Sequence, residues 1–107
     1  MTILMQVYSR PLEGMEDEYN DWYNKVHLSE VVAIQGILSA QRYELTEAQQ
    51  IPEQNYKYLA VYELENENVL GTLKNLLAAA STMDMGSSLD LKSAQVSIFK
   101  SITDVIS

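Results

Sequence analysis

Apolar and polar positions along this chain follow two different periods, and each change of period marks an expected element. Residues 2–9 (TILMQVYS) are apolar and β-prone, which predicts a first strand, and Pro11 and Gly14 mark the turn after it. From residue 15 the spacing becomes helical, because apolar or aromatic side chains recur at intervals of three, four and seven: Met15, Tyr19, Trp22, Tyr23 and Val26. These residues share one face of an expected helix.

The helical pattern changes sides close to His27. If the same straight helix continued, Leu28 and Val32 would fall on its solvated acidic stripe. We therefore expect the helix to stop or bend near His27, with Ser29 capping a second short helical turn. Gly36 is expected to end that turn, because glycine tolerates the backbone conformation that commonly terminates a helix.

The remainder of the chain predicts three more strands and one helix. The strands are expected at residues 37–45, 56–65 and 93–106. Apolar residues recur at helical spacing over 69–80, and Asn66 or Asn68 is expected to cap that helix. Residues 81–92 are expected to form a loop or an irregular segment.

The expected order is β-α-β-β-α-β, which indicates an α+β fold of the ferredoxin-like type over a single domain of residues 1–107. In this arrangement two helices cover one face of a four-stranded antiparallel sheet. The strands are apolar at nearly every position, whereas a sheet with one wet face would alternate more cleanly. The second face is therefore expected to be covered by another copy of the chain, giving a homodimer.

Charge and composition narrow the possible partners. Fifteen acidic residues against seven basic ones give a net charge of −8, which argues against binding to nucleic acid or to an anionic membrane surface. There is no cysteine, so no disulfide or thiol chemistry is expected. The N-terminus has no signal-peptide pattern, and no apolar run approaches the roughly 18 residues that cross a bilayer. We expect a cytoplasmic protein.

Two adjoining stretches resemble a known family. The run at residues 13–30, EGMEDEYNDWYNKVHLSE, is followed by the strand at 36–45, GILSAQRYEL. Together they resemble the EthD-like branch of the dimeric α+β-barrel superfamily, over most of the chain in topology and over about residues 13–45 in motif. Members commonly show a Trp, then a His, then a Pro two residues later, and Trp22 and His27 match the first two.

Two positions depart from that pattern. Ser29 stands where the Pro would be, and Gln35 stands where members have a Pro before the Gly.

The resemblance implies two sheets packed face to face across a dimer. The superfamily includes cofactor-independent monooxygenases, cyclases and dehydratases, isomerases and haem-degrading members, so the fold does not select among these activities.

His27 and Tyr23 are the candidate catalytic residues. An unperturbed imidazole titrates at about pH 6.5, so His27 can act as an acid or a base. The resemblance supports this role, because in related cyclases and dehydratases a His or Tyr facing the pocket moves the proton. The alternative is that His27 bonds a carbonyl at the helix end and fixes the bend.

Four further side chains are candidates for substrate binding: Trp22, Arg42, Tyr43 and Tyr62. The aromatic rings could hold a flat apolar ligand, or they could simply pack in the core and across strands. Arg42 lies in an otherwise apolar strand, where a charge is rarely unpaired. It could bind a substrate carboxylate or enolate, or it could pair with Glu44, Glu63 or an acid of a partner chain.

The sequence leaves three functions open. The first is a small enzyme that uses His27 for acid–base chemistry on an apolar or aromatic carbonyl compound, by isomerisation, cyclisation, dehydration or monooxygenation. The second is a non-catalytic dimer that binds a hydrophobic small molecule or assists another enzyme of a catabolic or secondary-metabolism pathway. The third is a dimer whose interface is fully packed. With one His and no Cys, we predict no metal site, and we expect no cofactor.

Overall fold

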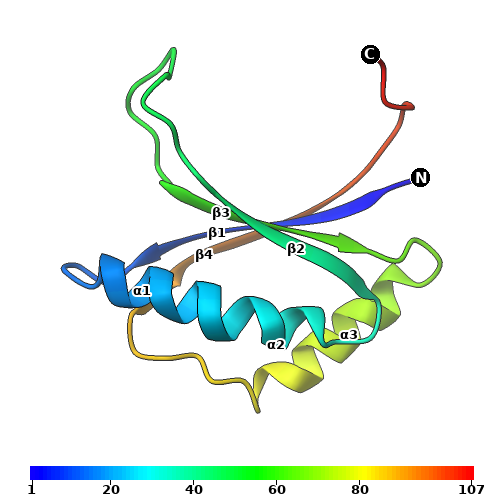
Figure 1. The fold of residues 1–107 in the computed structure, drawn as a ribbon. Helices are drawn as coiled ribbons and strands as arrows, with labels where there is room; N and C mark the ends of the chain where they lie inside the picture. Colours follow the sequence, from blue (N-terminus) through cyan, green and yellow to red (C-terminus); the bar gives the residue numbers. More distant parts are fainter.

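A computed structural model describes residues 1–107 and shows a four-stranded antiparallel sheet with helices on one face (Figure 1). The strands are β1 (Ile3–Pro11), β2 (Ile37–Glu44), β3 (Tyr58–Leu64) and β4 (Leu89–Lys100). They lie in the order β2-β3-β1-β4, and every neighbouring pair is antiparallel. The predicted ferredoxin-like fold is confirmed, with β1 and β3 in the centre of the sheet.

Strand β4 is shifted toward the N-terminus relative to its predicted range of 93–106. It pairs with β1 beyond a register shift between Tyr8 and Arg10, so that Arg10 lies opposite Asp90. The start of β4 was predicted as a loop because its residues are polar. These residues form a strand through long-range pairing with β1 and not through a local preference. Residues 101–107 follow as a tail outside the sheet.

The segment between β1 and β2 is helical throughout and changes its winding in the middle. It consists of α1 (Glu16–Trp22), a π-helical turn η1 (Tyr23–His27) and α2 (Leu28–Val32). The helix does not stop near His27, which has helical dihedral angles of φ −69° and ψ −43°, and the predicted cap at Ser29 was wrong, because its side chain forms no capping hydrogen bond. A π-helical turn takes up an extra residue. Val31 therefore returns to the buried face that carries Tyr23.

The ends of the other helix follow the prediction. Helix α3 (Val69–Ala80) begins at Asn68, whose Oδ1 accepts a hydrogen bond from the Gly71 backbone N–H at 3.0 Å. Helix α2 ends earlier than predicted, with Ala33 rather than Gly36 at its C-cap. Gly36 has φ +99° and forms part of the turn between α2 and β2, a backbone conformation that glycine tolerates best. None of the helices combines the length and the apolar character needed to span a bilayer.

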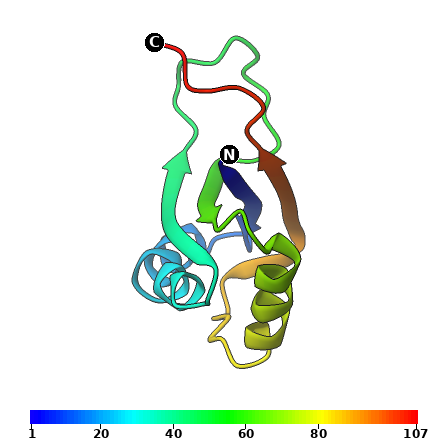
Figure 2. The same ribbon diagram turned by 90° about the vertical axis from the view of Figure 1, so that its right-hand side faces the viewer.

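The core lies between the sheet and the helices. Its strand residues include Ile3, Met5, Ala60, Tyr62 and Leu64, and its helix residues include Tyr19, Tyr23 and Val31. The opposite face of the sheet, here called the open face, is uncovered within one chain. Figures 1 and 2 show that the β2–β3 connection and the C-terminal tail both extend past this face, on the side away from the helices. The open face is therefore bordered by two projecting segments.

Candidate functional site

Trp22, Tyr23 and His27 lie together on the helical segment with their rings in contact. The His27 ring stacks on Trp22 with a centroid separation of 4.6 Å and an interplanar angle of 21°. It meets the Tyr23 ring edge-on at 5.1 Å. Tyr23 is buried, and burial raises the pKa of its phenol, with the neighbouring Tyr62 adding to the effect. Tyr23 is therefore a neutral phenol in the folded protein.

The His27 side chain is only 13% exposed. Its Nδ1 is buried without a hydrogen-bond partner and lies 4.0 Å from Glu30 Oε1, which is also buried and without a partner. Burial lowers the pKa of His27, and the nearby Glu30 carboxylate partly opposes this shift. The imidazole is therefore held neutral at pH 7.

Trp22 and Glu30 also hold the connection between α3 and β4. Trp22 Nε1 donates a hydrogen bond to the Asp84 carbonyl at 2.8 Å, and the Asp84 backbone N–H donates to Glu30 Oε2 at 3.0 Å. Gly86 lies so close to the indole that a Cβ there would be 3.0 Å from Trp22 Cδ1. Trp22 and Glu30 beside His27 thus have a structural role, because they hold residues 81–88 against the helical segment.

We expect acidification to destabilise this protein through His27. A His whose pKa is lower in the folded than in the unfolded state binds its proton more readily when unfolded. Well above pH 6.5, protonation of His27 therefore does not affect the free energy of unfolding. As the pH drops from about 6.5 toward the lowered pKa of folded His27, the free energy of unfolding falls. Urea unfolding of wild type and of His27→Gln, from pH 7.5 to pH 5.5, should show a steeper loss in wild type. Parallel pH profiles for the two proteins would contradict this.

Arg42 lies on the helix-facing side of β2, opposite Ala60. Its Nη1 donates to Asn24 Oδ1 at 2.7 Å, and its Nη2 donates to Asn20 Oδ1 at 2.8 Å. The guanidinium carbon also lies over three tyrosine rings, with centroid distances of 4.3, 5.3 and 5.4 Å to Tyr23, Tyr58 and Tyr19. Arg42 forms no ion pair with Glu44, with Glu63 or with any other acid of the chain.

A hydrogen-bonded chain continues from Asn20 along the same edge of the molecule. Asn20 Nδ2 donates to the Tyr58 hydroxyl at 3.0 Å, and that hydroxyl donates to Glu16 Oε2 at 2.5 Å. Lys57 Nζ donates to the same carboxylate oxygen at 3.0 Å. The Tyr58 hydroxyl, followed by Lys57, lowers the pKa of Glu16. The sequence carried no signal for this network, because its members come from one helix, one strand and the connection before that strand.

Tyr43 and Tyr62 lie on opposite faces of the sheet. Tyr62 is 1% exposed and packs in the core, whereas Tyr43 is 46% exposed and lies on the open face. The predicted site residues therefore separate into two groups: Trp22, Tyr23, His27, Arg42 and Tyr62 lie on the helix side, and Tyr43 alone lies on the other. Nowhere do three or more His, Asp or Glu side chains gather as they would to hold a metal ion.

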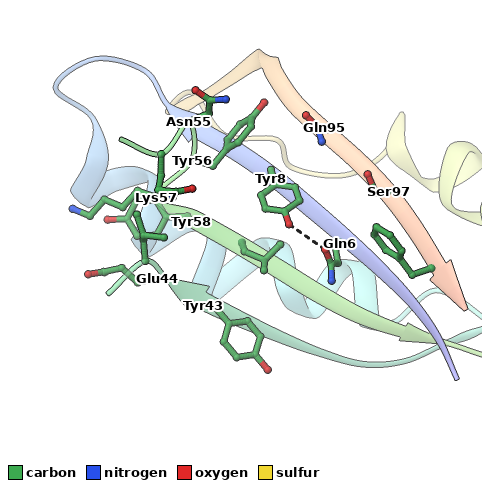
Figure 3. Close-up of a pocket in the computed structure, with 14 residues that line it drawn as sticks. Gln6, Tyr8, Tyr43, Glu44, Asn55, Tyr56, Lys57, Tyr58, Gln95 and Ser97 are labelled. Carbon is green, nitrogen blue, oxygen red and sulfur yellow. Dashed lines mark hydrogen bonds between the residues drawn. The ribbon is translucent and has the colours of Figure 1, made fainter. Parts of the chain in front are cut away.

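A cleft of about 570 Å³ lies over the open face, at the end where the β2–β3 connection projects (Figure 3). Its lining is mixed: Tyr8, Tyr43 and Phe99 supply rings, and Gln6 and Gln95 supply amides. The Tyr8 hydroxyl donates to Gln6 Oε1 at 3.1 Å, and the Tyr8 and Tyr56 rings lie 5.4 Å apart. His27 does not line this cleft. Such a surface suits a flat organic molecule with a few polar groups.

Comparison with known proteins identifies the fold. No family model matches the sequence, and no curated protein is significantly similar to it. The solved structure of an ethyl tert-butyl ether d (EthD) family protein from Bacillus halodurans C-125 is similar, with a TM-score of 0.66 and 13% identity, over 95% of this chain and 100% of that one. A protein from Shewanella loihica PV-4, provisionally described as a monooxygenase, matches with a TM-score of 0.55 and 16% identity, over 96% and 98%. At these identities the likeness establishes a common fold, and this chain has the fold of an EthD family protein.

Proposed function

We propose that this chain forms a homodimer through the open face of its sheet and binds a small, flat organic molecule in the cleft between the two copies. The observation that carries this proposal is the cleft itself, which lies on the one sheet face that no helix covers. Leu4, Leu59, Val61 and Phe99 add partly exposed apolar surface to that face. Burying this surface against a second copy would be favourable, and the second copy would shield the ligand from water.

The dimer is tested by placing a charge in the middle of the open face. Val61 lies opposite both Gln6 and Gln41, so it is central in the sheet. In a two-fold dimer Val61→Glu would bury two like charges near each other, and we expect this variant to run as a single chain. Wild type should have twice the chain mass of 12.1 kDa at micromolar concentration, measured by light scattering.

The matched control is Leu77→Glu, the same kind of exchange on the outer face of α3, where the side chain is already 76% exposed. This variant should remain a dimer. A panel of aromatic and polyketide-like carbonyl compounds should raise the melting temperature of wild type and of Leu77→Glu, but not that of Val61→Glu. Wild type with the mass of one chain, or equal ligand stabilisation in all three proteins, would refute the proposal.

Acid–base catalysis is the second candidate function. It is supported by the neutral imidazole of His27 with an unpartnered Nδ1 beside the Glu30 carboxylate, next to the phenol of Tyr23. In this role His27 would move a proton on a carbonyl compound, without a cofactor. Access to the ring would require residues 81–88 to move, because Trp22 and Glu30 hold that connection over the cluster. Equal conversion of every panel compound by wild type and His27→Gln would exclude this role.

A further inference from the structure

We propose a second binding site, for the carboxylate of a small organic acid, at Arg42. A hollow of about 330 Å³ lies beside β2, lined by Asn20, Asn24, Arg42, Tyr43, Glu44 and Tyr58. It adjoins the open-face cleft at Tyr43, Glu44 and Tyr58, but Arg42 and the two asparagines reach it from the helix side. The site is complete within one chain, so it does not depend on the proposed dimer.

The first step in the argument is the missing counter-ion. Five of the seven Lys and Arg side chains form no ion pair in this strongly acidic chain, and Arg42 is the only half-buried one among them, because the other four are exposed. Its side-chain partners are two neutral amide oxygens. A cation withdrawn from water without an anion carries a desolvation cost that a bound carboxylate would offset.

The second step is the count of hydrogen-bond donors. A guanidinium has five N–H donors. Two bind Asn20 and Asn24, and the Nε–H is buried without a partner. One N–H therefore remains on each terminal nitrogen. Asn24 Nδ2 forms no hydrogen bond within the chain and is a further donor at the hollow. Each of these N–H groups can donate a charge-assisted hydrogen bond to a carboxylate oxygen, which is stronger than a bond between neutral groups.

The third step is rigidity. The guanidinium is held by two hydrogen bonds and lies within 5.4 Å of three tyrosine ring centroids, so little freedom remains for a ligand to remove. The partly exposed Tyr43 ring at the rim adds apolar surface for the carbon skeleton of the acid. These contacts select a carboxylate attached to a flat apolar group, for which benzoate is a simple probe.

Glu44 allows a test in which removing a charge should strengthen the binding of an anion. Its carboxylate lines the same hollow without pairing with Arg42, so it repels a bound anion. In NMR titrations, Glu44→Gln should therefore bind benzoate about two- to fivefold more tightly than wild type. Arg42→Met should bind it about tenfold or more weakly, and Asn24→Ala should also bind it more weakly. Benzamide, the neutral isostere of benzoic acid, should not bind at this site.

The remaining outcomes are equally decisive. If Arg42→Met does not fold, the opposite shifts expected for Glu44→Gln and Asn24→Ala still test the site. Binding of benzoate that is unchanged in Arg42→Met, absent from wild type or matched by benzamide would overturn the inference, and Arg42 would then only attach α1 to β2. Val61→Glu should keep its benzoate site. Loss of benzoate binding in Val61→Glu alone would place the probe in the dimer cleft, which would overturn this inference but leave the proposed function standing.

Discussion

Replacing Gly36 with Ala is expected to lower the free energy of unfolding by about 2–5 kcal/mol. Gly36 has φ +99°, a conformation that costs an L residue about 1–2 kcal/mol. A Cβ at this position would also overlap Thr72 Oγ1 on α3 and lie 2.9 Å from Thr72 Cβ. Forcing a side chain into a packed contact costs a further ~1–3 kcal/mol. The loss would be measured by urea unfolding at pH 7.5, where His27 is neutral.

The matched control is Gly14→Ala. Gly14 also has a positive φ, +78°, but a Cβ there would meet nothing within 4 Å. Gly14→Ala should therefore lower the free energy of unfolding only by the cost of the positive φ for an L residue, about 1–2 kcal/mol. The difference between the two variants isolates the contact of Gly36 with Thr72. Equal losses would mean that α3 moves aside without cost, which would contradict close packing between the end of the helical segment and α3.

The second large effect is expected for Tyr62→Ala, which should cost about 3–5 kcal/mol, the range found when a buried aromatic side chain is removed. Tyr62 is 1% exposed and lies in the middle of β3, opposite Met5 on one side and Ala40 on the other. Removing the ring would leave a cavity between the central strands and the helices. Tyr62→Phe keeps the ring, so urea unfolding should show that it retains most of this stability.

Tyr43→Ala is the matched exchange on the open face. Tyr43 is 46% exposed within one chain, so in the single-chain Val61→Glu variant its removal should change the free energy of unfolding by only about 0.5 kcal/mol. Because Tyr43 lines the cleft, Tyr43→Ala in the dimeric protein should lose part of the stabilisation that ligands give to wild type. If Tyr43→Ala proved as destabilising as Tyr62→Ala in the single-chain variant, where no partner covers the open face, the two tyrosines would not lie on opposite faces of the sheet as described.

The order of the elements was predictable because it depends on local patterns. Apolar spacing distinguishes a strand from a helix within a few residues, and the signals for α3 and its cap at Asn68 lie within one turn of each other. The start of β4 was not predictable in this way, since its polar residues become a strand only by pairing with the far end of β1.

The π-helical turn near His27 could not be predicted from the local sequence pattern. The apolar pattern does change sides there, and the sequence indicated this correctly. An interrupted helix and a π-helical turn both produce such a change, and the structure contains the π-helical turn, which keeps the helix continuous. Packing of Tyr23 and Val31 on the same side against the sheet favours the continuous form.

The candidate sites depended still more on tertiary structure. The sequence supplied the charge balance, the single His and an Arg in an apolar strand, all of which are matters of composition and order. It did not supply the side of the sheet on which Arg42, Tyr43 and Tyr62 lie, because shifting a strand by one residue exchanges its two faces. It also could not bring Asn20 and Asn24 to Arg42, since these contacts depend on how α1 and η1 cross β2. Local pattern thus accounts for the elements, and long-range packing accounts for the sites.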